Sequence, residues 1–157
     1  MTPATRELLA SQDDAWGFLS EPYHLSDWWP GLLSVEPDRR GFSPGARWRV
    51  RMVADPLRLW ILRLPGMGRP SGPDRMMTLV ITAIEPRRRW SFALCPPVKD
   101  GKDAAVRPRS VEIELRPLAP DRTEAAVTVA TGSREELHIA RAAVDRLYDL
   151  VQMAATL

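Results

Sequence analysis

The sequence predicts an α+β domain in which an antiparallel sheet packs against one long helix at the C-terminus. Three observations lead to this fold class. The 157 residues suffice for one domain with a sizeable core. From residue 32 to about residue 130, apolar and polar residues alternate in successive segments, which is typical of strands with one buried face. After Gly132 the apolar spacing changes to three and four, which is typical of a helix.

The N-terminal part is predicted to form one short strand and two short helices. The strand covers residues 4–10. Ser11 then begins the motif S-Q-D-D, a capping box whose hydroxyl and carboxylates favour the positive end of a helix. This helix would end at Pro22 and bury two residues, Trp16 and Leu19. Residues 23–29 would form the second helix, which Pro30-Gly31 ends.

The middle of the chain is predicted to form successive antiparallel strands with one apolar and one charged face. Turns are expected at Glu85-Pro86 and at Pro120-Asp121, and a long Pro/Gly loop at 65–75. Residues 57–64 (LRLWILRL) form an apolar strand whose two faces the pattern does not distinguish. The residues expected to face inward are Trp48, Val50, Met52, Met77, Leu79, Ile81, Ala83, Trp90, Phe92, Leu94, Val111, Ile113, Leu115, Ala125, Val127 and Val129. Charged residues expected to form cross-strand pairs on the outer face are Arg47, Arg49, Arg51, Glu112 and Glu114.

The last segment is predicted to be helical over residues 133–155. Ser133 begins a second capping box, S-R-E-E. The apolar stripe is wide enough to lie along the concave face of the sheet and comprises Leu137, Ala140, Val144, Leu147, Val151 and Ala154.

Several motifs follow one another in an unusual order. These are D-D-A-W-G-F-L-S-E-P (13–22), S-D-W-W-P (26–30), F-S-P-G-A-R-W (42–48) and I-T-A-I-E-P-R-R-R-W (81–90), with the amphipathic helix behind them. From end to end, residues 1–157, the chain resembles the START-like helix-grip (SRPBCC) superfamily, which includes polyketide cyclases, the birch pollen allergen family and lipid-transfer domains. The resemblance implies a single helix-grip domain, in which a curved antiparallel sheet wraps around the long C-terminal helix and leaves an apolar cavity.

The resemblance also suggests which residues would line that cavity. Walls are expected from the strands and the helix at Trp48, Trp60, Leu79, Ile81, Trp90, Phe92, Ile113 and Val144. Trp28 and Trp29 lie on the short second helix and point about 100° apart, so one ring can face the cavity while the other is core; both can equally be core anchors. Arg141 and Tyr148 flank the apolar stripe and could reach the rim, with a rim salt bridge and a half-buried tyrosine as the alternative.

Candidate acid–base and nucleophilic residues are few. His138 shares a helix face with Asp145 and Asp149, opposite the apolar stripe, and is expected in solvent. A surface capping role is expected for His24 rather than a place at the cavity entrance. Cys95 lies at a strand end without a nearby histidine partner and is expected to be inert. No catalytic residue is therefore assigned, and no metal site or cofactor is expected.

Composition and charge narrow the function classes further. The net charge of +2 is small and dispersed, so no nucleic-acid partner is expected. Cys95 is the only cysteine, which excludes an internal disulfide. No apolar run approaches the roughly 18 residues of a membrane span, and the N-terminus lacks a signal-peptide pattern, so a cytoplasmic protein is expected.

Three functions remain open at this point. The first is binding or transport of a hydrophobic small molecule, such as a lipid, isoprenoid or polyketide, in the internal cavity. The second is a cofactor-independent enzyme of the polyketide cyclase/aromatase kind. The third is a protein-interaction module like the superfamily members that activate a chaperone ATPase or act on ribosomes. The sequence leaves the oligomeric state open, a homodimer included.

Overall fold

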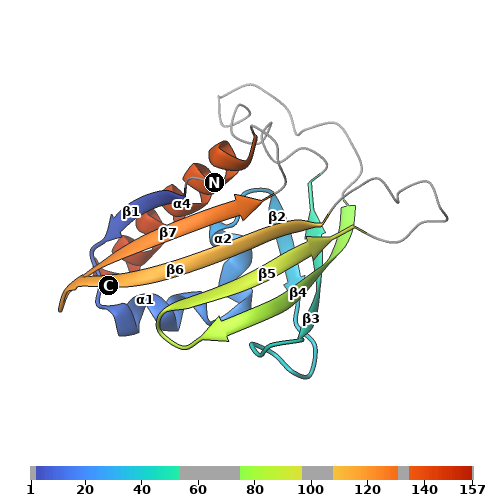
Figure 1. The fold of residues 1–157 in the computed structure, drawn as a ribbon, viewed down its shortest axis with the longest axis horizontal. Helices are drawn as coiled ribbons and strands as arrows, with labels where there is room; N and C mark the ends of the chain where they lie inside the picture. Colours follow the sequence, from blue (N-terminus) through green and yellow to red (C-terminus); the bar gives the residue numbers. More distant parts are fainter. Residues whose placement is uncertain (1–2, 54–74, 97–107, 131–134, 157) are drawn as a thin grey trace.

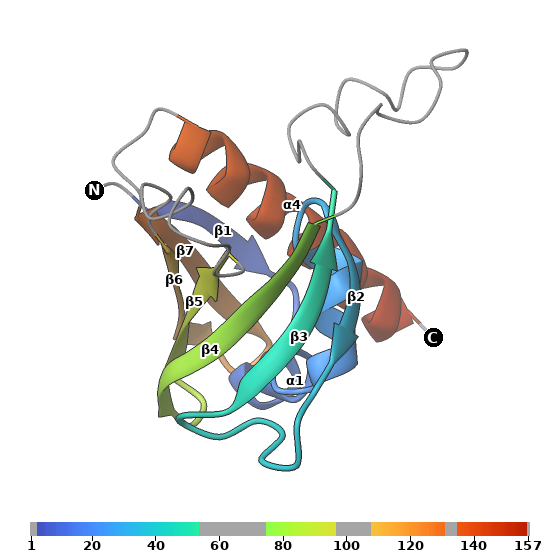
Figure 2. The same cartoon turned by 90° about the vertical axis from the view of Figure 1, so that its right-hand side faces the viewer.

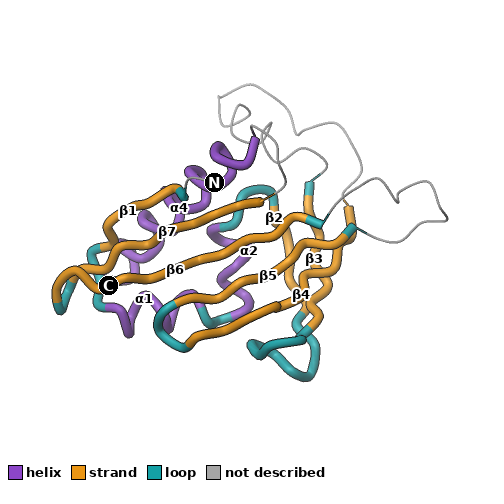
Figure 3. The backbone as a smooth tube through the Cα atoms, in the orientation of Figure 1, coloured by secondary structure: helices purple, strands orange, loops and turns teal. Residues whose placement is uncertain are grey.

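A curved antiparallel sheet with helices on one face forms the molecule (Figures 1 and 3). The structure is a computed structural model and describes residues 3–53, 75–96, 108–130 and 135–156. Its strands are β1 (Ala4–Leu8), β2 (Leu32–Glu36), β3 (Arg47–Met52), β4 (Arg75–Glu85), β5 (Arg89–Cys95), β6 (Arg109–Ala119) and β7 (Arg122–Ala130). Within these described ranges the sheet has seven strands in the order β1-β7-β6-β5-β4-β3-β2, and every neighbouring pair is antiparallel.

The helices are α1 (Gln12–Leu19), a 3-10 turn η1 (Pro22–His24), α2 (Leu25–Trp28) and α4 (Glu135–Thr156). Figure 2 shows the sheet curving from β1 round to β2, with the long helix α4 crossing its concave side. Helix α4 packs mainly on β1, β7 and α2, whereas α2 packs on β2. The predicted α+β fold, with its long C-terminal helix and two short N-terminal helices, is confirmed.

The predicted start of α1 is also confirmed. Ser11 is the N-cap, and its Oγ accepts a hydrogen bond from the backbone N of Asp14 at 3.1 Å. The helix buries Ala15 and Leu19, but Trp16 is only half-buried and packs at the margin of the core. The predicted strand 57–64 and the cap at Ser133 lie outside the described residues, as does the predicted loop 65–75 up to residue 74; Arg75, its last residue, instead begins β4.

Strand parity follows the predicted alternation in β3, β5, β6 and β7, whose inward residues are buried. One residue of β4 departs from it: Ala83, predicted to face inward, is exposed. Ile81 pairs with Phe92 and Ile84 with Trp90, so β4 has one residue more than β5 between these pairs. This β-bulge reverses the parity beyond Ile81 and turns Ile84 toward the core in place of Ala83.

Helix α4 confirms the predicted helix but buries a face that is rotated from the predicted stripe. Its buried residues are Ile139, Ala140, Ala142, Ala143, Val144, Leu147 and Val151. Because Ile139 and Ala143 belong to this face, its centre moves away from Leu137, whose exposed fraction is 39%. Ala154 is also exposed, because it lines an open groove near the end of the helix. The predicted stripe is therefore wrong at these two residues.

On the outer face, Glu112 of β6 forms a cross-strand ion pair with Arg89 of the neighbouring β5, with Nη1 and Oε1 3.2 Å apart.

None of the helices in the described part of the chain combines the length and the apolarity that a membrane crossing requires.

Candidate functional site

Six aromatic side chains come together on the concave face of the sheet and are called here the aromatic cluster. They come from α2 and its C-terminal end, from the loop between β2 and β3, from β3 and from β5, and are Trp28, Trp29, Phe42, Trp48, Trp90 and Phe92. The parity of β3 and β5 places the strand residues on this face. All except the half-buried Phe42 have an exposed fraction of 1% or less.

The rings form a continuous chain of contacts with Trp90 at its centre. The Trp90 ring lies 4.8 Å from Phe92, 5.1 Å from Phe42 and 6.3 Å from Trp48, measured between ring centroids. Trp29 contacts Phe92 edge-to-face at 5.6 Å, and Trp28 contacts Trp29 edge-to-face at 5.8 Å. These separations are those of favourable aromatic pairs, so the cluster is a packed unit that joins α2 to the sheet.

The indole N–H groups of the cluster differ in their hydrogen bonding. Trp48 Nε1 donates to the carbonyl oxygen of Gly41 at 2.7 Å. The Nε1 atoms of Trp28, Trp29 and Trp90 are buried and have no acceptor in the part of the chain that the structure describes. Three buried donors without acceptors are unusual in a folded protein, where such groups are nearly always paired.

The loop between β2 and β3 closes over the cluster and is held by Asp38. The carboxylate of Asp38 accepts hydrogen bonds from the backbone N of Arg47 at 2.9 Å and of Arg40 at 3.0 Å. The bond from Arg47, assisted by that from Arg40, lowers the pKa of the Asp38 carboxyl below its ordinary value of 3.8. Gly41 adopts a φ of 60°, and its carbonyl is the acceptor for Trp48. Asp38 thus fixes the segment that carries Phe42 onto Trp90.

A pH dependence follows from the lowered pKa of Asp38. Because the folded-state pKa is depressed, its contribution to stability is present above pH 3.8 and is lost as the pH falls through the folded-state pKa. We therefore expect Asp38→Asn to be less stable than wild type at pH 7, and to lose less of its stability between pH 5 and pH 2. Urea unfolding across this pH range measures the difference.

The control for this prediction is Asp121→Asn, which removes a carboxylate in the turn between β6 and β7. Asp121 makes no ion pair within the described residues, and this variant should follow the wild-type curve. If Asp38→Asn shows the same acid destabilisation as wild type, the carboxylate of Asp38 does not hold the loop.

The structure brings most of the predicted site residues into one core. Leu79 lies opposite Trp48 in the sheet, Ile81 opposite Phe92, and Ile113 opposite Trp90, and all three are fully buried. Val144 is buried on α4 and belongs to the same continuous hydrophobic core. Trp60 lies outside the described residues. Phe42 was not among the predicted site residues, although it stands in the F-S-P-G-A-R-W motif, because a loop residue has no periodicity that marks its side chain as inward.

Two predicted residues of α4 lie away from the aromatic cluster. Arg141 is exposed, because the rotation of the buried face moves it toward solvent. Tyr148 is half-buried at the edge of the sheet, where the guanidinium of Arg6 from β1 lies 3.8 Å from its ring centroid. Arg6 also pairs with Asp145 at 2.6 Å. Tyr148 is half-buried, as the alternative interpretation has it, but the salt bridge beside it joins Arg6 to Asp145 and does not involve Arg141.

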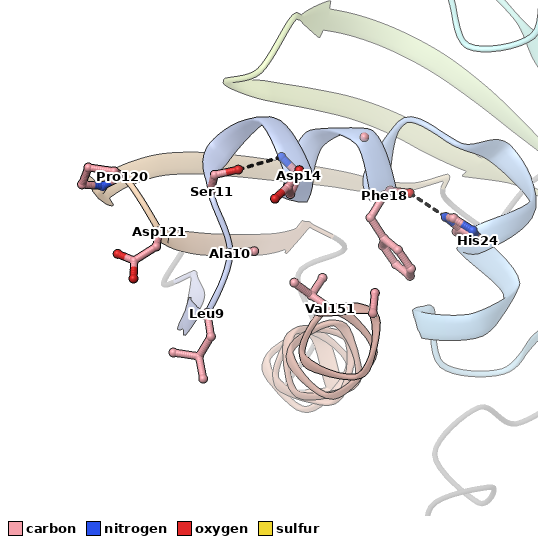
Figure 4. A pocket seen from close by; sticks show the side chains of 11 residues that line it. Leu9, Ala10, Ser11, Asp14, Phe18, His24, Pro120, Asp121 and Val151 are labelled. Carbon is pink, nitrogen blue, oxygen red and sulfur yellow. Dashed lines mark hydrogen bonds between the residues drawn. The ribbon is translucent and has the colours of Figure 1, made fainter. Parts of the chain in front are cut away.

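A second concave feature is an open groove of about 600 Å³ between α1, the C-terminal part of α4 and the turn between β6 and β7 (Figure 4). Phe18 and Val151 face each other across it. The charged residues among its described lining are Asp14 and Asp121, both exposed carboxylates at the rim. Asp14 lies in the first turn of α1, where a carboxylate favours the helix. The groove is therefore open, and these two exposed carboxylates are the charged groups that its described lining offers to a ligand.

The two histidines and the cysteine do not form a catalytic group. His24 stacks on Phe18 at 4.3 Å, and its Nδ1 lies 3.0 Å from the carbonyl oxygen of Phe18 in the last turn of α1. Since a carbonyl only accepts, Nδ1 carries the proton, and His24 caps α1. His138 is exposed, as predicted, and Cys95 is half-buried and free. Among the described residues, no group of three or more side chains could hold a metal ion.

The buried interior contains almost no polar side chain. Thr123 is the one polar or charged residue among those described that is buried, and its Oγ1 donates to the carbonyl oxygen of Ala10 at 2.9 Å. Among the described residues, the aromatic cluster therefore has no buried charged neighbour, and three of its own indole N–H groups are buried without an acceptor.

Comparisons with known proteins identify the fold. No family model and no curated protein matches the chain. Among solved structures, it is similar to the di-domain ARO/CYC StfQ from the steffimycin biosynthetic pathway, at 14% identity and a TM-score of 0.65 over 99% of this chain and 46% of StfQ. It is similar to DR_A0006 from Deinococcus radiodurans, at 18% identity and a TM-score of 0.62 over 99% of this chain and 98% of that one.

A third similar structure is DynU16, from the dynemicin biosynthetic locus, at 16% identity and a TM-score of 0.59 over 98% of this chain and 47% of DynU16. The chain thus spans about half the length of StfQ and of DynU16. At these identities the likeness concerns the fold, and it shows that this chain has the helix-grip α+β fold of structures that include an ARO/CYC protein.

Proposed function

We propose that the protein binds a hydrophobic small molecule, polyketide-like in its aromatic character, at the aromatic cluster, whose packed rings separate to admit it. The observation that carries the proposal is the division of the concave face into two halves. On the side of β1 and β7, the inward residues are aliphatic apart from Thr123, and α4 packs directly on the strands. On the side of β3 and β5 they include three large rings, Trp48, Trp90 and Phe92, beside Val50, Met52 and Leu94. The ring of Phe92 contacts Trp29 at the end of α2.

Large rings in this position suit a ligand better than aliphatic side chains would. Each ring offers a flat apolar face and a defined edge, and aromatic pairs gain from stacked and edge-to-face arrangements that a planar ligand can adopt. Apolar walls with a few fixed polar atoms are typical of small-molecule sites. The N–H groups of Trp28, Trp29 and Trp90 are polar atoms of this kind.

A titration with the neutral dye Nile red tests the proposal. We expect saturable binding at one site per chain, seen as dye emission excited through the tryptophans. Trp90→Leu keeps an apolar side chain but removes the central ring, and should weaken binding about tenfold or more, because the flat faces are lost. Tyr23→Ala is the control, since Tyr23 is 63% exposed and lies outside the cluster.

Two outcomes would contradict this proposal. The first is the absence of saturable binding. The second is binding that Trp90→Leu leaves unchanged, which would place the ligand elsewhere, for example in the groove beside Phe18.

A cyclase or aromatase is the second candidate function, favoured by the likeness in fold to the ARO/CYC StfQ. Such an enzyme folds a reactive chain and moves protons with groups beside it. The buried interior of the described residues offers no titratable side chain for this, and binding is therefore favoured. Mass spectrometry of a bound poly-ketone before and after incubation separates the two functions, since cyclisation with loss of water lowers its mass and binding does not.

A further inference from the structure

The open groove between α1, the end of α4 and the turn between β6 and β7 is a second concave surface, and no residue of the aromatic cluster is in its described lining. Its volume of about 600 Å³ is within the range of sites that hold small molecules. Phe18 of α1 and Val151 of α4 face each other across it, as Figure 4 shows. Leu9 and Ala10, which lead from β1 toward α1, add to this apolar wall. An apolar group can therefore be received here without any separation of packed rings.

Gly17 keeps this groove open. It lies in the interior of α1 and lines the groove. Glycine inside a helix is destabilising relative to alanine, so its presence there calls for a reason. Backbone conformation is not the reason, because the positive-φ glycines of the described chain are others. Close packing is not the reason either, because a Cβ at Gly17 would have no neighbouring atom of the described residues within 4 Å. What the missing side chain does is leave room in the groove.

The charged side chains of the described lining are both carboxylates. Asp14 of α1 and Asp121 of the turn form no ion pair and no side-chain hydrogen bond within the described residues. Two other polar side chains of the lining already have partners in the protein. Ser11 Oγ accepts a hydrogen bond from the backbone N of Asp14, and His24 Nδ1 donates to the carbonyl oxygen of Phe18. The two carboxylates are thus the charged groups that remain for a ligand.

The helix ends at the groove also favour a positive ligand. Helix α4 ends beside it, and no basic residue in the last turn of α4 offsets the partial negative charge of the terminal carbonyls. The positive end of α1 is already met by the Ser11 cap and by the two acids of its first turn. Arg122, which follows Asp121 in the chain, pairs instead with Glu7 at 2.9 Å. A cation is therefore favoured over an anion.

We propose that this groove binds a small primary amine with an apolar body. The ammonium group pairs with a carboxylate at the rim, Asp14 or Asp121, and the apolar body lies between Phe18 and Val151. An ammonium group carries three donors and no acceptor, which suits a lining whose charged groups are acceptors only. This site is separate from the aromatic cluster, so the inference does not depend on the function proposed for the cluster.

NMR spectroscopy of the isotope-labelled full chain tests the proposal with three ligands of one shape. These are 4-phenylbutylamine, 4-phenylbutan-1-ol and 4-phenylbutyrate, which share an apolar body and are respectively cationic, neutral and anionic at pH 7. Saturable shifts of the backbone amide signals of Gly17, Phe18 and Val151 give a dissociation constant for each ligand. We expect the amine to bind about threefold to fivefold more tightly than the alcohol at low salt, because an exposed ion pair contributes modestly, and the butyrate to bind least well.

Variants then locate the site. Gly17→Leu places a side chain in the groove and should weaken amine binding about tenfold or more, whereas α1 should be retained because leucine is the better helix former. At least one of Asp14→Asn and Asp121→Asn should bring the ratio of the amine and alcohol dissociation constants close to one. Asp149→Asn is the matched control, since it removes an exposed carboxylate of α4 that is not in the described lining, and it should keep the wild-type ratio.

Each result decides part of the proposal. If the three amide signals shift with none of the ligands, the groove is not a site. Equal affinities of wild type for the amine and the alcohol overturn the choice of an amine, and a preference that neither aspartate variant changes overturns the pairing with these carboxylates. If the same signals shift on dilution of the protein alone, a second copy of the chain occupies the groove and the proposal is wrong. Should Gly17→Leu fail to fold, the asparagine variants still decide the ligand class.

Discussion

Replacing Trp90 with alanine is expected to lower the free energy of unfolding by about 3–5 kcal/mol, the usual cost of removing a large buried aromatic side chain. Trp90 is 1% exposed and its ring contacts Phe42, Trp48 and Phe92, which come from three different segments of the chain. Its removal therefore opens a hole at the junction of β3, β5 and the loop between β2 and β3. Domains of this size have about 5–15 kcal/mol of stability, so the variant should lose between about a fifth and the whole of it.

Urea unfolding followed by circular dichroism measures this loss. Trp16→Ala is the matched control: Trp16 contacts Phe42 at the margin of the same aromatic network but is only half-buried, and its loss should cost clearly less. A cost at Trp90 below about 1.5 kcal/mol would contradict the packed cluster, because such a value fits a ring whose neighbours can collapse into its place.

The strands were predictable because their signal is local. In β3, arginines alternate with Trp48, Val50 and Met52, and the pattern alone places each residue on its face. The alternation in β4 is the exception, because it does not continue to the end of the strand. The bulge beyond Ile81 depends on how β4 pairs with β5, which no feature of the β4 sequence reveals, and it exposes Ala83.

The candidate site was predictable only in part, for a related reason. Strand parity indicated that the large rings of Trp48, Trp90 and Phe92 face inward, and burial of each is confirmed. Phe42 was not among the predicted site residues, because its position depends on the loop between β2 and β3. That loop is held by the hydrogen bonds that the carboxylate of Asp38 accepts from its backbone. Hydrogen-bond partners of indoles also depend on tertiary neighbours. The sequence therefore could not distinguish Trp48, which has an acceptor, from Trp90, which has none among the described residues.

The second large effect on stability is expected on α4, where the direction of the buried face decides which leucine is core. The sequence pattern places both Leu137 and Leu147 in the core, whereas the structure buries only Leu147 of the two. Both Leu137 and Leu147 fit the three- and four-residue spacing of the apolar stripe. In the structure, Leu147 is 0% exposed on the face that packs against β1 and β7, whereas Leu137 is 39% exposed. Leu147→Ala should therefore lower the free energy of unfolding by about 2–5 kcal/mol through lost burial and a residual cavity.

Leu137→Ala is the matched control, since it makes the same chemical change on the same helix. At its exposed position little apolar area is lost, and the free energy of unfolding should fall by less than about 1 kcal/mol. Alanine is also the better helix former, which offsets part of that loss. Urea unfolding of both variants gives the comparison. Equal costs at the two positions would mean that Leu137 is core, that the buried face is centred as the sequence pattern predicts, and that Ile139 and Ala143 do not set the phase of α4 against the sheet.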